Sequence, residues 1–167
     1  MHSPPTTIRP ANPHDYEALC ALWTELDEHH RAGRLNLFRI PEGPRREREW
    51  ALDLVRGPDS TILVAEATGG ALAGLAALRV ETPTPLPIRI TQPFVEVHNL
   101  VVTAAFRRTG LAKRLILEAV RWAAARGLGE LELTVHEFNT DARAFYDAAG
   151  FSTIRRRMRL PVELGPC

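Results

Sequence analysis

The sequence predicts an α/β protein with helices on both faces of one sheet. The sheet is expected to be mixed, of the α+β type, with both parallel and antiparallel strand pairs. Apolar residues alternate between strand and helix spacing along the whole chain, in the order β-α-α-β-β-β-α-β-α-β. Glycine and proline mark the boundaries between these segments. Residues 94–135 form a strand-helix-strand unit, whose two strands should lie parallel with a right-handed crossover.

The first third of the chain predicts one strand and two helices. Residues 6–9 read as the strand. Asn12 is a good cap for the helix that follows, and Pro13 fits its first position. A second helix is expected from about Pro44 to Val55, ended by Gly57 and Pro58.

A hairpin and a further strand are expected next. Residues 61–66 and 71–80 have strand composition, and the two glycines at 69–70 form a tight turn between them. The segment 82–87 contains three prolines and is expected to be a loop. Residues 94–102 return to a strand pattern.

The last third predicts two helices, each followed by a strand. A helix is expected over residues 110–126 and a strand over 130–135. A second helix should cover 140–149, because Gly150 can end it. Residues 151–160 then have the composition of a final strand, in which arginines would guard an exposed edge.

Composition narrows the class of protein. The 167 residues suit a single domain, 1–167, and a net charge of +1 favours neither nucleic acid nor a membrane as partner. The two cysteines, Cys20 and Cys167, lack disulfide or metal-ligand spacing, so no metal site is expected. We found no secretory signal and no stretch long enough to span a bilayer, which makes a cytoplasmic protein the expectation.

A basic loop between a strand and a helix predicts an anion site. The strand ends at Val102 and the helix starts near Gly110, where unpaired backbone N–H groups and the helix dipole favour negative charge. Arg107 and Arg108 add positive charge, and Gly110 and Ala112 allow a phosphate to approach the backbone. The fingerprints of Rossmann folds and of ATP-binding loops are both absent.

The loop pattern Arg107-x-x-Gly110-x-Ala112 resembles the acetyl-CoA loop of the GNAT superfamily of N-acetyltransferases. The flanking sequences "VEVHNLVVTAAFRRTGLAKRLILEAV", "NTDARAFYDAAGF" and "TIRPANPHDYEAL" extend the resemblance over nearly the whole chain. It implies the GNAT fold and an enzyme that transfers an acetyl group from acetyl-CoA to a primary amine by direct attack in a ternary complex. The cofactor pyrophosphate would be held by Arg107, Arg108, Thr109, Gly110, Leu111 and Ala112.

The resemblance also assigns the pantetheine arm and the proton donor. Main-chain groups of Leu100, Val101 and Val102 would bind the arm as if the cofactor were an added strand. Tyr146 is the candidate general acid, because a phenol is protonated at neutral pH; the alternative is a tyrosine whose ring packs on the sheet. Asn139 would bind pantetheine, cap the helix that follows it, or do both.

The general base has two candidates. Glu96 and His98 are spaced by two on one strand and should project from the same face, which Phe94 and Leu100 would share. Glu96 lies where some GNAT members carry a base glutamate, and an imidazole ordinarily changes charge near neutral pH. Proton loss through water, with both residues facing solvent, remains the alternative.

The acceptor amine is not identified by the sequence. The substrate side is expected in the segments 33–44 and 82–93 and at the start of the second helix. Their arginines would suit a carboxylate or phosphate but are interpreted as ordinary surface residues. The residues offered are Arg34, Phe38, Arg39, Arg45, Arg46 and Arg89.

Two other functions stay open at this point. One is a non-catalytic acyl-CoA-binding module that senses the cofactor or bridges partners, and the other is an unrelated phosphate-binding protein. The resemblance also allows a homodimer, because many such proteins pair through their late strands.

Overall fold

The computed structural model describes residues 5–34, 37–44, 46–88 and 90–162. Its contacts divide the chain into two compact units, residues 1–134 and 135–167. The first unit holds most of the secondary structure: β1 (Thr6–Pro10), η1 (Pro13–Asp15), α1 (Tyr16–Gly33), α2 (Arg48–Arg56), β2 (Ser60–Ala67), β3 (Leu72–Glu81), β4 (Phe94–Val102), η2 (Ala104–Phe106), α3 (Leu111–Ala124) and β5 (Leu131–Leu133). The second unit holds α4 (Thr140–Ala148).

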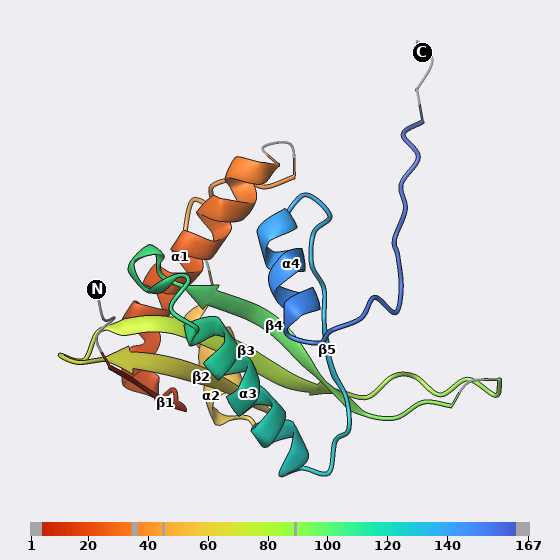
Figure 1. Cartoon of the computed structure of the whole chain (residues 1–167), viewed down its shortest axis with the longest axis horizontal. Helices are drawn as coiled ribbons and strands as arrows, with labels where there is room; N and C mark the ends of the chain where they lie inside the picture. The colour runs from red at the N-terminus through yellow and green to blue at the C-terminus, as the bar shows by residue number, and fades with distance from the viewer. Residues whose placement is uncertain (1–4, 35–36, 45, 89, 163–167) are drawn as a thin grey trace. The chain divides into compact units, whose positions relative to one another are not determined.

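The sheet of the first unit runs in chain order, β1-β2-β3-β4-β5 (Figure 1). The first four strands pair antiparallel, and β4 pairs with β5 in parallel. The mixed sheet is therefore confirmed, and so are the parallel strands of the predicted strand-helix-strand unit. The hairpin turn is also confirmed, since Gly69 and Gly70 have φ angles of 97° and 88°, which favour glycine.

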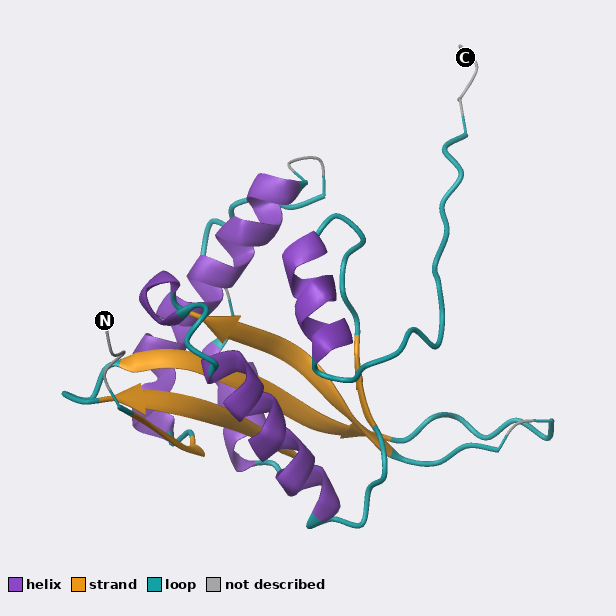
Figure 2. Ribbon diagram, viewed as in Figure 1, coloured by secondary structure: helices purple, strands orange, loops and turns teal. Residues whose placement is uncertain are grey.

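Helices cover both faces of this sheet (Figure 2). On one face, α1 and α2 bury a cluster that contains Leu19, Trp23 and Leu75. On the other face, α3 buries a second cluster around Leu78, Val95 and Leu115. The sheet thus separates two apolar cores, and a strand in its middle must supply apolar residues to each.

Helix ends agree with the sequence at one place and differ at another. Asn12 accepts a hydrogen bond from the His14 N–H and completes a capping box, as predicted for the start of this segment. The second helix begins at Arg48, later than the predicted start at Pro44. The preceding backbone is drawn toward α1 instead, where the Tyr16 hydroxyl donates to the Arg46 carbonyl at 2.9 Å.

A β-bulge interrupts the pairing of β3 with β4. Leu78 pairs with Val97, and the residue before it in β3, Ala77, pairs with Asn99, so His98 is the extra residue. After the bulge the alternation is reversed: Leu100 packs in the α3 core, while Val101 packs in the α1 and α2 core. The prediction that Leu100 shares a face with Glu96 is therefore wrong.

The second unit contains α4 but not the strand predicted over residues 151–160. Residues 151–162 have no strand pairing, and the apolar side chains after Phe151 are exposed; Ile154 is 73% and Met158 is 91% exposed. The composition of a strand is present, but a strand also needs a backbone partner for its hydrogen bonds, and no described residue supplies one.

Candidate active site

The outer edge of β4 is open along its second half. β5 pairs with β4 only from Val95 to Val97. Beyond Val97, β4 is paired on its β3 side, and no described residue forms a strand on the other side. The main-chain groups of Leu100, Val101 and Val102, predicted to bind pantetheine, therefore lie on a segment with a free edge, and such an edge can accept an added extended chain.

The loop after β4 is shaped by two left-handed residues. Arg108 has a φ of 61°, which is uncommon for a residue with a side chain, and Gly110 has a φ of 84° directly before α3. No side chain caps this helix, so the N–H groups of its first turn are open. A Cβ on Gly110 would meet no atom within 4 Å, which shows that the space directly beside this residue is open.

The Arg107 side chain is held by other residues of the protein. Its Nη2 lies 2.7 Å from Glu25 Oε1, and its Nε donates to the Val102 carbonyl at 3.1 Å. The same Glu25 oxygen accepts the Ala104 N–H at 2.9 Å. Arg107 and Glu25 therefore fix the path of the chain from β4 into the loop. The Thr109 hydroxyl adds a bond to the Phe106 carbonyl.

Glu96 and His98 lie together with a third residue, Glu81 of β3. His98 Nε2 is 3.6 Å from Glu81 Oε1 and 3.8 Å from Glu96 Oε2. All three side chains are about one third exposed, at 32%, 38% and 31% for His98, Glu81 and Glu96. They form a solvent-accessible acid-base cluster. Their ligand atoms lie within 4.8 Å of one another, a spacing that could also accommodate a metal ion.

Two tryptophans lie beside this cluster. The Trp23 Nε1–H donates to Asn99 Oδ1 at 3.1 Å, which connects the bulge to α1. Trp50 of α2 packs against Trp23 with ring centroids 5.7 Å apart. The Arg46 guanidinium lies about 6 Å from both indoles and 3.1 Å from Asp27, so it belongs to this packed wall. Arg45 and Arg89, also predicted on the substrate side, lie outside the described residues.

The second unit carries Asn139 and Tyr146 on one short helix. Asn139 caps α4, with Oδ1 accepting the Ala142 N–H at 3.2 Å. The Tyr146 ring meets Phe151 edge-on at 5.5 Å and lies 5.3 Å from Phe145. Burial raises the pKa of Tyr146 to about 12 because the phenolate would lose hydration. The phenol therefore keeps its proton over the neutral range.

Sequence reasoning missed two residues of the site, Glu81 and Glu25, and one feature of the backbone, the bulge at His98. Glu81 was outside the strand predicted over 71–80, and Glu25 was one of several polar residues on the first helix. The bulge at His98 left no signal, because a single inserted residue still fits an alternating pattern. For Glu81, extending the predicted strand by one residue would have placed it across from Phe94.

Comparison with known proteins agrees with this architecture. The model of the acetyltransferase (GNAT) family matches residues 17–151. The chain belongs to this family. The [ribosomal protein bS18]-alanine N-acetyltransferase of Haemophilus ducreyi is 41% identical over 61 residues, which are 36% of this chain and 42% of that protein. The chain thus matches less than half the length of this curated relative.

Solved structures match over nearly the whole chain. A mutant of the BH1408 protein from Bacillus halodurans superposes with a TM-score of 0.88 and 27% identity, covering 94% of this chain and 99% of that one. The aminoglycoside N-acetyltransferase AAC(6')-Iy, bound to a CoA-containing bisubstrate analogue, gives 0.74 and 20%, with 96% and 99% covered. At this low identity the second match shows the fold alone. Among the described residues, no helix is both long and apolar enough to cross a membrane.

Proposed function

We propose that the protein transfers an acetyl group from acetyl-CoA to a primary amine by direct attack in a ternary complex. The observation that carries this proposal is the combination of a free β4 edge with an uncapped helix start at the end of the same strand. An extended amide-containing arm fits the first, and a pyrophosphate fits the second. CoA has both groups, joined in this order.

The residues present fit the pyrophosphate. Positive φ angles at Arg108 and Gly110 turn the loop, and the first N–H groups of α3 are free of side-chain caps. Leu111 and Ala112 open the helix, so their N–H groups would donate to phosphate oxygens together with that of Gly110. Arg107 holds the loop through Glu25, and Arg108 and Thr109 complete it.

The reaction joins the amine nitrogen to the thioester carbonyl carbon. The nitrogen lone pair forms the new C–N bond, and the C–S bond breaks when the tetrahedral intermediate collapses. The amine must lose a proton, and we assign its removal to the cluster of Glu96 and His98. Both side chains are accessible, and they lie close enough to share a proton through one water molecule.

The departing thiolate requires a proton, which we assign to Tyr146. Its pKa of about 12, raised by burial, means that the phenol is fully protonated at neutral pH. Asn139 caps the helix that carries Tyr146, and a contact with pantetheine is also part of the proposal.

A calorimetric titration with acetyl-CoA, followed by an amine screen that detects free CoA thiol, tests this function. Binding together with thiol release in the presence of an amine supports the proposal. Tight binding with no transfer to any amine would indicate an acyl-CoA-binding module instead. Absence of acetyl-CoA binding would overturn the proposal.

The setting of the reaction is proposed as well. We place the protein in the cytoplasm, without nucleic acid or membrane as partner and without a metal, and allow that it forms a homodimer. Sedimentation at micromolar concentration tests the last point.

A further inference from the structure

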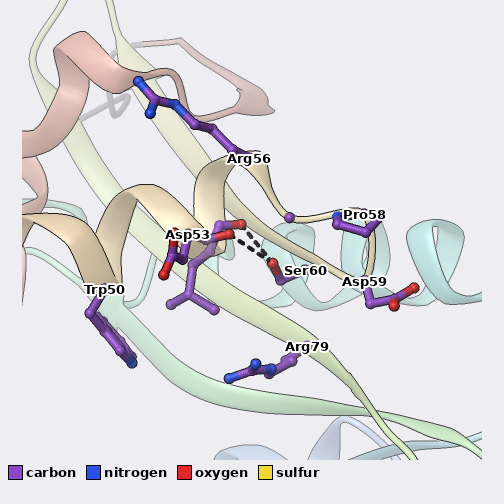
Figure 3. A pocket seen from close by; sticks show the side chains of 9 residues that line it. Trp50, Asp53, Arg56, Pro58, Asp59, Ser60 and Arg79 are labelled. Atoms are coloured by element: carbon purple, nitrogen blue, oxygen red, sulfur yellow. Dashed lines mark hydrogen bonds between the residues drawn. The ribbon is translucent and has the colours of Figure 1, made fainter.

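A cavity lies beside the acid-base cluster, on the α1 and α2 face of the sheet. It has a volume of about 630 Å³, within the range of small-molecule sites. Its walls come from the end of α2, the turn after it and the facing strands (Figure 3). The residues that line it are Trp50, Asp53, Leu54, Arg56, Gly57, Pro58, Asp59, Ser60 and Arg79.

Arg79 connects this cavity to the proposed chemistry. It pairs directly with Glu96 across β3 and β4, so the two side chains emerge next to each other on the same face. Of the residues that line the cavity, Arg79 alone lies on a strand that pairs with β4. Arg79 is therefore the lining residue through which the cavity adjoins Glu96.

The Arg79 guanidinium is available to a ligand. Its side chain is exposed, and no hydrogen bond or ion pair joins it to another described residue. By contrast, Arg46 and Arg107 are held by Asp27 and Glu25. Figure 3 shows Arg79 below α2, on the strand side of the cavity and beneath the level of Trp50.

The other charges of the cavity lie on its far wall. Asp53 and Arg56 come from α2, and Asp59 comes from the turn that follows it. Two carboxylates and one guanidinium leave this wall with a net negative charge, whereas Arg79 supplies the permanent positive charge beside Glu96, Glu81 and His98. The indole of Trp50, 37% exposed, adds an apolar surface for the body of the ligand.

We infer that this cavity is the acceptor site and that Arg79 selects amines that carry an oxyanion, a carboxylate or a phosphate, a short distance from the nitrogen. A guanidinium binds either group through two parallel hydrogen bonds. The inference rests on the proposed acetyl transfer and adds the substrate class. The short spacing follows from the pairing of Arg79 with Glu96, whose Cα atoms are about 5 Å apart in such a pair.

Three amines of similar length test it: β-alanine, O-phosphoethanolamine and propylamine. The wild-type protein is expected to acetylate one or both anionic amines with a kcat/KM at least tenfold above that for propylamine. The amine preferred among the first two distinguishes carboxylate from phosphate. Arg79→Gln should remove the preference, and Arg79→Lys should keep part of it. Arg126→Gln is the control, because Arg126 stacks on Trp122 at the end of α3.

Binding of the same amines to the CoA-saturated protein gives a second measurement that needs no turnover. Arg79→Gln should weaken binding of the anionic amine and leave propylamine unchanged. If propylamine is preferred, or if the preference survives in Arg79→Gln, the inference is wrong although acetyl transfer stands. If the amines bind as expected but no thiol is released, the acetyl transfer is wrong and the anion selectivity stands.

Discussion

The proposed donor and acceptor sites on the two sides of β4 are built from different groups. On the outer edge and at the loop after the strand, the proposed CoA site consists of main-chain groups, set by a missing strand partner and two positive φ angles. On the α1 and α2 face, the proposed acceptor site consists of side chains from four separate elements. A backbone site needs only a few residue types at fixed spacing, whereas a side-chain site can change at every position. The donor site can therefore be predicted from the sequence, whereas the acceptor site cannot.

The largest effect is expected at the donor loop. Gly110→Val forces a β-branched residue to a φ of 84°. The strain, roughly 1–3 kcal/mol, should lower acetyl-CoA affinity about 10- to 100-fold because the loop leaves its phosphate-binding path. Calorimetry measures this change.

Gly127→Val is the matched control, since Gly127 has a φ of 70° at the opposite end of α3 and equally open surroundings. It should destabilise the protein to a similar degree and leave the affinity unchanged. Equal losses of affinity in both variants would mean that strain in α3, and not the loop, controls binding.

The acid is the next test, on the second unit. Tyr146→Phe should lower kcat about 100-fold, the size of effect typical for a general acid, while the ring contact with Phe151 is kept. Tyr16→Phe is the control, because the Tyr16 hydroxyl donates to the Arg46 carbonyl and has no role in the proposed reaction. A Tyr146→Phe variant as fast as the parent would remove this residue from the mechanism.

The same phenol makes a prediction about pH. Burial raises the pKa of Tyr146 from the ordinary 10.0 to about 12, so the folded state holds this proton more tightly than the unfolded state. The linked stability is complete below pH 10 and is lost as the pH rises toward 12. Urea unfolding at several alkaline pH values should show this loss in the wild type and a smaller one in Tyr146→Phe.

On the acceptor face, Glu96→Gln and His98→Gln distinguish the two candidate bases. The variant that removes the base should lose about 100-fold in kcat/KM at neutral pH, and the other should lose little. Glu118→Gln, at an exposed pair with Arg121, is the control. If neither substitution slows the reaction, the amine loses its proton to water.

Smaller effects are expected at the ion pair that joins α1 to the loop after β4. Glu25→Gln removes the ion pair with Arg107, which is half exposed, so acetyl-CoA affinity should fall only about 2- to 5-fold. Glu28→Gln, which breaks the ion pair with Arg31 on the same helix, should leave the affinity unchanged. A loss above tenfold for Glu25→Gln would show that Arg107 itself contacts the phosphates.

No effect is expected from metal removal. Dialysis against EDTA should leave kcat unchanged, because the proposed chemistry uses Glu96 and His98 as proton acceptors and not as ligands. Activity that falls on dialysis and returns with a divalent cation would instead assign a metal to the cluster of Glu81, Glu96 and His98.

The part of this fold that follows local rules could be predicted from the sequence. Turn glycines, the Asn12 cap and the basic loop all act within a few residues, and each is found where expected. The failures involve partners distant in the chain. The strand at 151–160 needed a pairing edge, and the face of Leu100 depended on a bulge that only the β3 register reveals. Arg79 had no signal, because its proposed role depends on its neighbour across the sheet.

The bulged residue of β4, His98, also has a consequence for deletions in this chain. Val97 and Asn99 already pair with consecutive residues of β3, so deletion of His98 would leave an unbroken ladder with both apolar cores still facing their helices. The register therefore predicts that the fold tolerates this deletion, whereas the proposed base cluster would lose His98. The sheet is complete without it, and the position can be gained or lost as a unit while the rest of the architecture stays in register.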